Sequence, residues 1–302
     1  MNSPSISQGI VCALWIPLTE AGQPDFPALD RHLEWLATTG IDGLLVLGST
    51  GRFPALSASI REALIRHVLK QVSPLRCLVN ISDLDQATVA HLGRVSKACG
   101  ASGVAIMAPW FYEQAQADLI EWFVAAGRAA ELPLWLYNFP ERTGNRIDLG
   151  TVKEVMAQVT VGGFKNSGEN QELLRELAKV ARATPFAVFA GADAHIPEVV
   201  ELGAVGCIGG LSNAVPEAMV RVFQAAVAGN PGEAAREQEL LLAVERRLHL
   251  VPFPWNVAAV MAARGLPVGA LPATMSRVTH AHYEQLKSEI QGVFREHGLA
   301  CF

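Results

Sequence analysis

Short apolar runs alternate with longer segments of helical period along most of the chain. Eight runs are almost continuously apolar, a pattern typical of parallel strands that are buried on both faces. These predicted strands cover residues 10–16, 43–47, 76–81, 103–107, 134–137, 159–165, 186–190 and 205–208. Segments with helical spacing of apolar residues lie between them, and include 26–39, 58–71, 86–99, 117–130 and 169–181.

This alternation predicts an α/β fold in which helices cover a parallel sheet. Eight repeats favour a closed (β/α)8 TIM barrel over an open doubly wound sheet, and no Gly-x-Gly-x-x-Gly follows the first strand. After residue 214 the pattern becomes helical, at 216–228, 233–250, 256–263 and 273–294. We therefore expect a barrel over 1–228 that carries the active site, and a C-terminal helical extension over 229–302 packed on it as one structural unit.

Side chains that commonly cap helices stand where several of the predicted helices begin. Asp83 or Asp85, Asp148, Asp193 and Asn213 all occupy positions typical of an N-cap. For Asp193 this capping role is the simplest interpretation.

Composition excludes several classes of protein. The 302 residues carry a net charge of −5 with a pI near 5.9, which argues against a nucleic-acid binder. No apolar run approaches the roughly 18 residues that cross a membrane, and the N-terminus lacks the pattern of a signal peptide. The five cysteines are widely spaced and form no Cys-x-x-Cys pair, so we expect reduced thiols, a cytoplasmic protein and no metal site.

Lys165 is the most informative single residue. It ends the apolar run 159–165, where an ammonium group is costly unless it takes part in chemistry or finds a partner. A desolvated, neutral amine is the nucleophile that forms a Schiff base with a carbonyl. The alternative is a lysine that reaches from a strand end to solvent, and only the surrounding residues decide between the two.

Other polar residues follow the carboxyl ends of the predicted strands, where TIM barrels place their active sites. Ser49 and Thr50 lie in a Gly-Ser-Thr-Gly loop that could hold a carboxylate, although Gly and Ser are also common in ordinary turns. Tyr137 could transfer protons or simply be a core aromatic residue. Arg142 could bind a substrate carboxylate, or pair at the surface with Glu141 or Asp148.

The glycine-rich stretch 203–210 invites interpretation as a phosphate loop, because barrels often bind phosphate after strands 7 and 8. No lysine or arginine accompanies it. We therefore expect these glycines to give the substrate room, and we find no support for a barrel enzyme that acts on phosphorylated sugars.

Together these motifs resemble the dihydrodipicolinate synthase / N-acetylneuraminate lyase family. The resemblance rests on 48–51 (Gly-Ser-Thr-Gly), 137–144 (Tyr-Asn-Phe-Pro-Glu-Arg-Thr-Gly), 163–168 (Gly-Phe-Lys-Asn-Ser-Gly) and 191–193 (Gly-Ala-Asp), and it extends over nearly the whole chain. It implies a TIM barrel with a C-terminal helical segment, and a homotetramer built as a dimer of dimers.

The resemblance also implies roles for individual residues. Lys165 matches the lysine that condenses with a 2-keto acid, Tyr137 matches the proton-relay tyrosine, and Ser49 acts with it. Ser49 and Thr50 match the pair that binds the keto-acid carboxylate and helps to position the tyrosine. Arg142 matches the arginine with which synthases hold the carboxylate of the second substrate. Two further positions, Gly191 and Ile208, match the lining of the pyruvate pocket. No metal or organic cofactor is implied, since the lysine supplies the chemistry.

Two positions depart from the family pattern. Synthases carry a tyrosine in the loop after strand 4 that completes the proton relay across a dimer interface, whereas this chain has Phe111, with Tyr112 one residue on. The family's Gly-x-x-Gly-Glu is here Gly-Ser-Thr-Gly-Arg, so Arg52 reverses a charge beside the site.

The predicted function is a Schiff-base lyase, an aldolase or dehydratase that acts on pyruvate or a larger 2-keto acid such as a 2-keto-3-deoxy sugar acid. The alternatives are 4-hydroxy-tetrahydrodipicolinate synthase and N-acetylneuraminate lyase. A sensor that merely binds a keto acid is the alternative from outside the enzymes, and it would have no use for a reactive amine.

Overall fold

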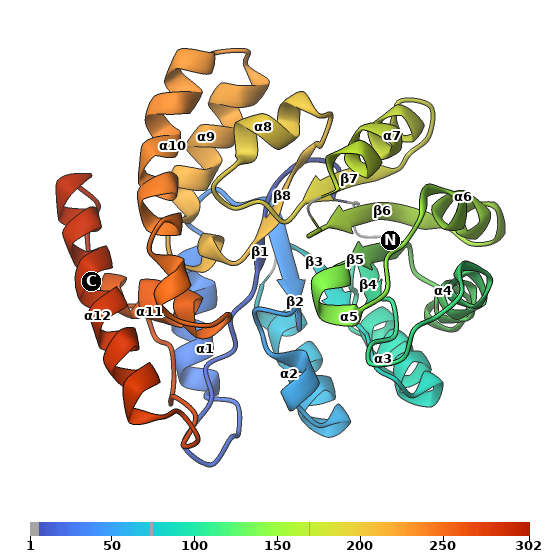
Figure 1. The fold of residues 1–302 in the computed structure, drawn as a ribbon. Coiled ribbons are helices and arrows are strands. Elements are labelled where there is room, and N and C mark those ends of the chain that lie inside the picture. The colour runs from blue at the N-terminus through green and yellow to red at the C-terminus, as the bar shows by residue number, and fades with distance from the viewer. Residues whose placement is uncertain (1–5, 73–74, 169) are drawn as a thin grey trace.

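The computed structural model describes residues 6–72, 75–168 and 170–302. Its centre is a closed barrel of eight parallel strands, in which each strand pairs with the next along the chain and the last pairs with the first (Figure 1). The strands are β1 (Gly9–Ala13), β2 (Gly43–Val46), β3 (Arg76–Asn80), β4 (Gly103–Met107), β5 (Leu134–Asn138), β6 (Val161–Asn166), β7 (Ala187–Ala190) and β8 (Gly206–Gly209). The predicted eight-stranded barrel is therefore confirmed.

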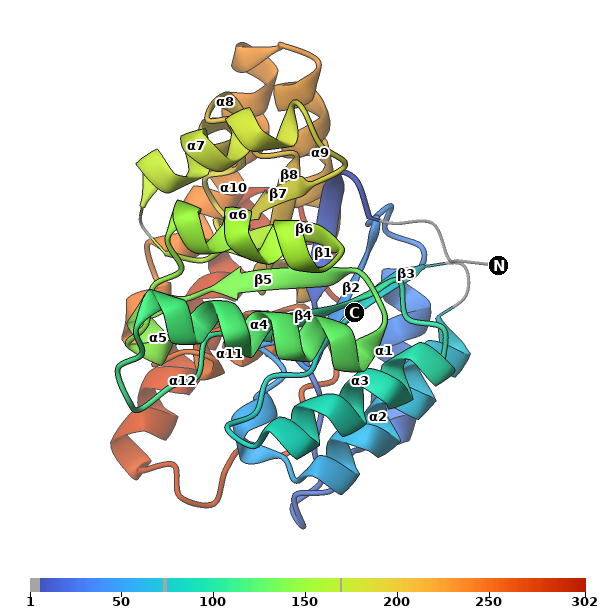
Figure 2. The same cartoon turned by 90° about the vertical axis from the view of Figure 1, so that its right-hand side faces the viewer.

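Helices surround the barrel and connect its strands. They are α1 (Phe26–Leu36), α2 (Ala58–Gln71), α3 (Gln86–Ala98), α4 (Gln116–Ala130), α5 (Pro140–Thr143), α6 (Leu149–Gln158), α7 (Gln171–Ala181), α8 (Ile196–Glu201) and α9 (Pro216–Val227). Figure 2 shows the barrel from the side, with the β5 arrow pointing toward α5 at the carboxyl end of the strands. Across the described part of the chain, no helix is both long and apolar enough to cross a membrane.

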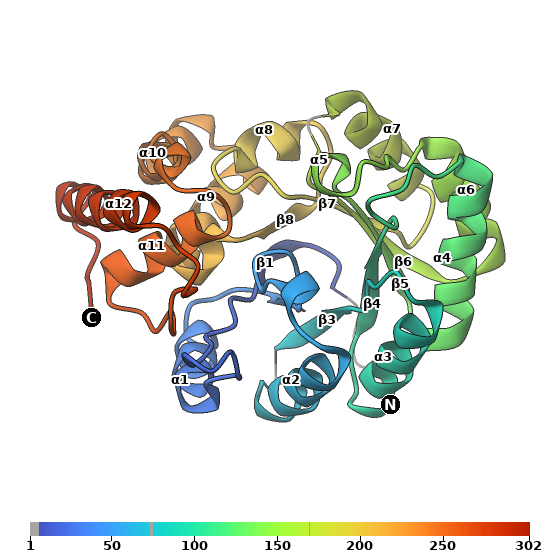
Figure 3. The same cartoon turned by 60° about the horizontal axis from the view of Figure 1, so that its bottom comes forward.

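Three further helices form the C-terminal extension, α10 (Pro231–Glu245), α11 (Trp255–Arg264) and α12 (Arg277–Glu296). Figure 3 shows α11 and α12 outside the strand ring, on the side of α1 and α10. A buried guanidinium joins this region to the barrel, because Arg264 makes two hydrogen bonds of 2.9 Å to Glu217 in α9. The helix predicted at 233–250 ends earlier, at Glu245, and a separate 3-10 turn follows at Leu248–Leu250.

The helix predicted at 169–181 begins at Gln171, and residue 169 lies outside the described residues. The helix predicted at 273–294 begins at Arg277, since Ser276 caps it by accepting a hydrogen bond from the backbone N–H of Thr279.

The first strand is shorter than predicted, since it ends at Ala13 and not at residue 16. Leu14, Trp15 and Ile16 remain fully buried, which explains why the apolar pattern continues through them. The Leu14 backbone N–H still donates to the Leu45 carbonyl on β2, whereas Trp15 finds its partners outside the sheet. The Trp15 backbone N–H donates to Asn213 Oδ1, and the Trp15 indole donates to the Val268 carbonyl in the extension. Residues 14–16 therefore connect the barrel to the C-terminal segment.

Two of the predicted N-caps are wrong. Helix α8 begins at Ile196, and Asp193 accepts hydrogen bonds from the backbone N–H groups of Gly210 and Leu211, beyond β8. Helix α9 begins at Pro216 and Asn213 lies too early to cap it. The Asn213 side chain instead donates to the carbonyls of Ala13 and Gly210. In both cases a side chain suited to capping satisfies the backbone of a neighbouring strand or loop.

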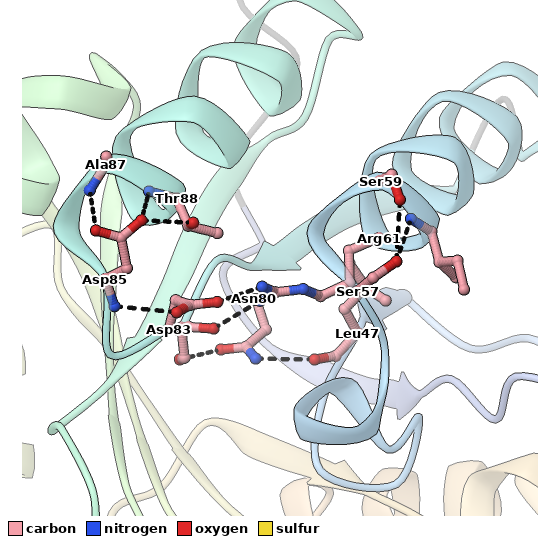
Figure 4. Close-up of polar contacts among 11 residues, drawn as sticks. Leu47, Ser57, Ser59, Arg61, Asn80, Asp83, Asp85, Ala87 and Thr88 are labelled. Carbon is pink, nitrogen blue, oxygen red and sulfur yellow. Dashed lines mark hydrogen bonds and ion pairs between the residues drawn. The ribbon is translucent and has the colours of Figure 1, made fainter.

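Asp85 is the confirmed N-cap of α3, where its carboxylate accepts from the N–H groups of Ala87 and Thr88 (Figure 4). Asp148 does stand at the N-cap position of α6, but its carboxylate pairs with Arg146 at 3.0 Å and makes no capping bond.

Large aromatic side chains fill the barrel interior below its carboxyl end. Trp135 on β5 packs against Phe189 on β7 with ring centroids 5.5 Å apart. Gly163 on β6 leaves space for the indole, because a Cβ there would lie 2.7 Å from Trp135 Cζ3. Side chains two residues apart on a strand point to the same face, so the next inward positions are Tyr137 on β5 and Lys165 on β6.

Candidate active site

Lys165 and Tyr137 form the centre of the candidate site. They are register partners on β6 and β5, and both are almost fully buried, with 5% and 2% of their surface exposed. Lys165 Nζ lies 4.2 Å from the centroid of the Tyr137 ring. Among the described residues, no carboxylate forms an ion pair with this ammonium group. The alternative of a lysine reaching from a strand end to solvent is therefore wrong, because the amine remains buried inside the barrel.

Ser49 is the next member of the site. Its hydroxyl lies 3.1 Å from the Tyr137 hydroxyl, so the loop after β2 contacts the residue at the end of β5. Thr50 follows it and is 4% exposed. It faces Gly210, where a Cβ would lie 3.2 Å from Thr50 Oγ1. The Ser49–Tyr137 hydrogen bond makes a proton path away from the lysine geometrically possible.

A network of polar side chains under the loop fixes its position. Leu47 has a left-handed backbone, with φ of 61°, and its carbonyl accepts a hydrogen bond of 2.8 Å from Asn80 Nδ2 (Figure 4). Asn80 in turn accepts from Ser82 Oγ, which also accepts from the backbone N–H of Met107 on β4. Arg61 from α2 donates to the Ser82 carbonyl. The network therefore links β2, β3 and β4 directly beside the site.

Asp193 is a residue near the site whose role the sequence did not reveal. Its half-buried carboxylate lies in a space that Gly209 leaves open, since a Cβ at Gly209 would come within 1.6 Å of Asp193 Oδ1. Burial raises the pKa of Asp193 to about 6, while hydrogen bonds from Gly210 and the charge of Lys165 oppose that rise. The motif Gly-x-Asp was the available signal, but its spacing also suited a helix cap.

The glycine stretch that we expected to give the substrate room serves the protein itself. Gly209 makes space for Asp193, and Gly206 allows β1 to approach, because a Cβ there would lie 2.0 Å from the Gly9 carbonyl. These contacts give the two glycines a packing role, and room for the substrate along the stretch 203–210 stays a prediction.

The two other positions expected to line a pyruvate pocket lie at the same end of the barrel. Gly191 follows β7, and a Cβ there would collide with Ser167 Oγ at 2.3 Å. Ile208 lies on β8 with 1% of its surface exposed. Their contact with substrate stays a prediction.

Arg142 lies in α5, with its guanidinium 5.8 Å from the Phe139 ring centroid and 5.6 Å from that of Phe253. Arg142 is exposed, but it forms neither of the alternative surface pairs, with Glu141 or with Asp148, and Asp148 pairs with Arg146. Arg142 instead lines a cavity of about 310 Å³ together with Ser49 and Arg52. The cavity therefore borders Ser49, whose hydroxyl contacts Tyr137, and two arginines.

The loop after β4 presents no tyrosine to the site within this chain. Phe111 and Tyr112 are 82% and 68% exposed, and their rings contact each other edge to face. Trp110 points the other way, packs against Phe53 and lines the cavity. Within 6–72, 75–168 and 170–302, no group of three or more His, Cys, Asp or Glu side chains is placed to hold a metal ion.

Comparison with known proteins identifies the family. The sequence model of the dihydrodipicolinate synthetase family matches residues 6–293. A 4-hydroxy-tetrahydrodipicolinate synthase 1 from Streptomyces coelicolor is 30% identical over 268 residues, which cover 88% of this chain and 87% of the relative.

Solved structures agree with this assignment. Dihydrodipicolinate synthase from Aquifex aeolicus aligns with a TM-score of 0.89 at 24% identity, covering 97% of this chain and 99% of that one. A prophage protein of the dihydrodipicolinic acid synthase family from E. coli K12, solved in complex with pyruvate, aligns with a TM-score of 0.88 at 26% identity over 96% and 99% of the two chains. The chain belongs to the dihydrodipicolinate synthetase family, whose members are class I lyases that work through a Schiff-base lysine.

Proposed function

We propose that this lyase is an aldolase or dehydratase that acts on pyruvate or on a larger 2-keto acid, such as a 2-keto-3-deoxy sugar acid. The observation that carries the proposal is the buried Lys165 amine against Tyr137, whose hydroxyl lies 3.1 Å from Ser49. A buried amine beside a proton-transferring phenol is what imine chemistry requires.

In the proposed reaction Lys165 Nζ attacks the keto carbon and water leaves, which forms an imine. For cleavage, Tyr137 takes the proton of the hydroxyl on the carbon beta to the imine carbon. The bond between the alpha and beta carbons then breaks, an aldehyde departs, and the electron pair flows to the imine nitrogen to give an enamine. Protonation of the alpha carbon and hydrolysis return the free amine and pyruvate.

Neighbouring residues have supporting roles in this proposal. Ser49 accepts and returns the proton through its hydrogen bond to Tyr137. Thr50, in the same loop, helps to hold the carboxylate of the keto acid, and Gly191 and Ile208 line the space for its methyl end. Arg142 holds a charged group on the rest of the substrate.

The synthase reaction is the alternative, and relatives at 25–30% identity bear the name 4-hydroxy-tetrahydrodipicolinate synthase. Two residues favour the aldolase or dehydratase. Phe111 cannot transfer a proton, and the neighbouring Tyr112 is 68% exposed. Arg52 brings a positive charge into the cavity beside Ser49. Assay of pyruvate with aspartate semialdehyde separates the two, since robust synthase turnover would contradict our preference. N-acetylneuraminate cleavage is tested in the same panel.

We also propose that the protein is a cytoplasmic homotetramer, a dimer of dimers, and that it needs no added cofactor. The barrel (1–228) and the extension (229–302) fold together, which the buried Arg264–Glu217 pair supports. Sedimentation and a chelator-treated assay test these expectations.

Borohydride trapping tests the proposed function. With pyruvate present, reduction should leave a pyruvyl adduct that peptide mass mapping places on Lys165. The Lys165→Ala protein should give no adduct, whereas Lys287→Ala, which removes a partly exposed lysine of α12, should react like wild type. Folded protein that forms no adduct with pyruvate or with larger keto acids would contradict the proposal and favour the keto-acid sensor.

A further inference from the structure

Arg52 is held rigidly at the edge of the cavity. Its backbone is left-handed, with φ of 58°, and its guanidinium lies between two indoles, 4.7 Å from the ring centroid of Trp15 and 4.8 Å from that of Trp255. Nη2 donates a hydrogen bond of 2.7 Å to the Ile16 carbonyl. These contacts leave the remaining N–H groups of the guanidinium for another acceptor.

No protein acceptor balances that charge in the described part of the chain. Arg52 Nε is buried without a hydrogen-bond partner there. Burial lowers the pKa of Arg52 to about 10, so its surroundings disfavour the charged form. Neither Arg52 nor Arg142 has an ion pair with a described carboxylate. A charge that is partly withdrawn from water is normally paired, and Arg52, half-buried beside the exposed Arg142 on the same cavity, has no such partner among the described residues.

One segment of the C-terminal extension holds both guanidinium groups. Phe253 packs near Arg142, and Trp255, two residues later, packs near Arg52. Phe253 and Pro254 also line the cavity. The extension therefore sets where both positive groups lie relative to the lysine end of the site.

The rest of the cavity wall is apolar. Phe53, Met107, Trp110 and Phe253 supply most of it, and Ser49 is the one uncharged polar side chain in the lining. Ser49 is already bonded to Tyr137. A chain of hydroxyl groups would lose its hydrogen bonds to water against such a wall, whereas a hydrocarbon or an aromatic ring would be favoured. At about 30 Å³ for each water-sized group, 310 Å³ holds roughly ten such groups.

We propose that Arg52 and Arg142 together bind a carboxylate at the far end of the substrate, and that the part between this carboxylate and the reacting carbon is apolar or aromatic. This rests on the proposed function, in which Lys165 carries the keto-acid end as an imine. Within that function it replaces the 2-keto-3-deoxy sugar acid named above by another class of 2-keto acid, in which the aldehyde fragment is an apolar body of about ten non-hydrogen atoms ending in a carboxylate. Guanidinium groups suit this partner because they bind carboxylates in a bidentate manner.

The test uses the condensation direction with matched aldehydes. The pyruvate enamine attacks the aldehyde carbon, a new C–C bond forms, the aldehyde oxygen takes a proton, and water releases the product from Lys165. The aldehydes are 4-formylbenzoate, benzaldehyde, 4-formylbenzenesulfonate and glyceraldehyde. Wild type should use 4-formylbenzoate with kcat/KM about 10- to 100-fold above benzaldehyde, the value of a charge-assisted hydrogen bond.

Substitution of Arg52 then separates a binding role from a purely structural one. Arg52→Gln should remove most of that preference, mainly by raising KM for 4-formylbenzoate, and Arg52→Lys should restore part of it. Arg236→Gln, at an exposed position of α10, serves as the matched control and should retain the wild-type preference. A preference for glyceraldehyde, or equal loss with charged and neutral aldehydes in Arg52→Gln, would overturn the proposal. A preference for 4-formylbenzenesulfonate over 4-formylbenzoate would overturn the assignment of a carboxylate.

A binding measurement makes the inference independent of the chemistry. Calorimetry with the Lys165→Ala protein should show tighter binding of 4-formylbenzoate than of benzaldehyde, and Arg52→Gln in that background should abolish the difference. If borohydride traps no adduct in wild type, the proposed function fails, while this binding experiment still decides whether Arg52 and Arg142 bind a carboxylate. If the adduct forms but no preference for the carboxylate appears, only the proposal that Arg52 and Arg142 bind a carboxylate is wrong.

Discussion

The two ends of the candidate site are built in different ways. The lysine end lies on two adjacent strands, where sheet register places Tyr137 opposite Lys165. The arginine end is assembled from the loop after β2, the short helix α5 and the start of α11, which are far apart in the sequence. The two ends of the site therefore have different roles. A rigid barrel fixes the chemistry, and connecting segments that can vary without disturbing the barrel choose the substrate.

The largest expected effect is at the lysine end. Lys165→Arg keeps a positive charge but removes the nucleophilic amine, so turnover should fall at least about 10³-fold, with no borohydride adduct. Steady-state assay with the best keto acid checks this, with Lys287→Arg as the control for the same change at a partly exposed lysine of α12. Turnover that survives in Lys165→Arg would move the chemistry away from the barrel strands.

Removal of the Tyr137 hydroxyl comes next. Tyr137→Phe keeps the ring beside Lys165 and should lower kcat by about 10²- to 10⁴-fold, the usual contribution of a general acid or base. Ser49→Ala should cost less, about 2- to 10-fold, because it removes one neutral hydrogen bond.

The control for the phenol is Tyr112→Phe, which changes an exposed side chain and should stay within about twofold of wild type. A large loss in Tyr112→Phe would mean that this second tyrosine enters the relay, and the synthase alternative would recover.

Asp193, near the lysine end of the site, should make the stability of the folded protein depend on pH. Its pKa is raised from 3.8 to about 6, so the folded state holds the proton more tightly than the unfolded chain. The stability this gives is complete below pH 4 and is lost as pH rises toward 6, with a total of up to about 3 kcal/mol. Urea unfolding of wild type and Asp193→Asn should therefore show the wild type losing that amount relative to the variant between pH 4 and 7. A stability difference that is constant or rises with pH would contradict the assignment.

The smallest effect is expected at the arginine end, where Trp255→Leu removes one of the two rings that flank Arg52. Imine formation by Lys165 should stay within about twofold, while the preference for 4-formylbenzoate over benzaldehyde should fall by about 2- to 10-fold, the scale of a cation–π contact. If adduct formation falls instead, the extension supports the lysine end as well, and the division between the two ends would not hold.

The lysine end could be predicted from the sequence because its information is local. An apolar run ending in lysine, another ending in tyrosine, and a Gly-Ser-Thr-Gly turn are each visible, and the barrel brings strand ends together. Barrel closure and the C-terminal helices followed from periodicity in the same way. Element ends were less accurate, since residues 14–16 stay apolar after leaving the sheet.

The arginine end could not be predicted because its contacts join distant segments. Nothing local indicates that Trp255 would pack beside Arg52, which lies about 200 residues earlier. Asp193 was assigned to a cap because a short polar residue before a helix suits that role equally well. Its true partners, Gly210 and Leu211, become neighbours only when β7 and β8 pair.

Borohydride trapping with pyruvate tests the central claim most directly. The account predicts a reduced pyruvyl adduct on Lys165, mapped by peptide mass analysis, which is absent from Lys165→Ala and unchanged in Arg52→Gln. An adduct on another lysine, or a folded protein that remains unmodified by pyruvate and by larger 2-keto acids, would contradict it.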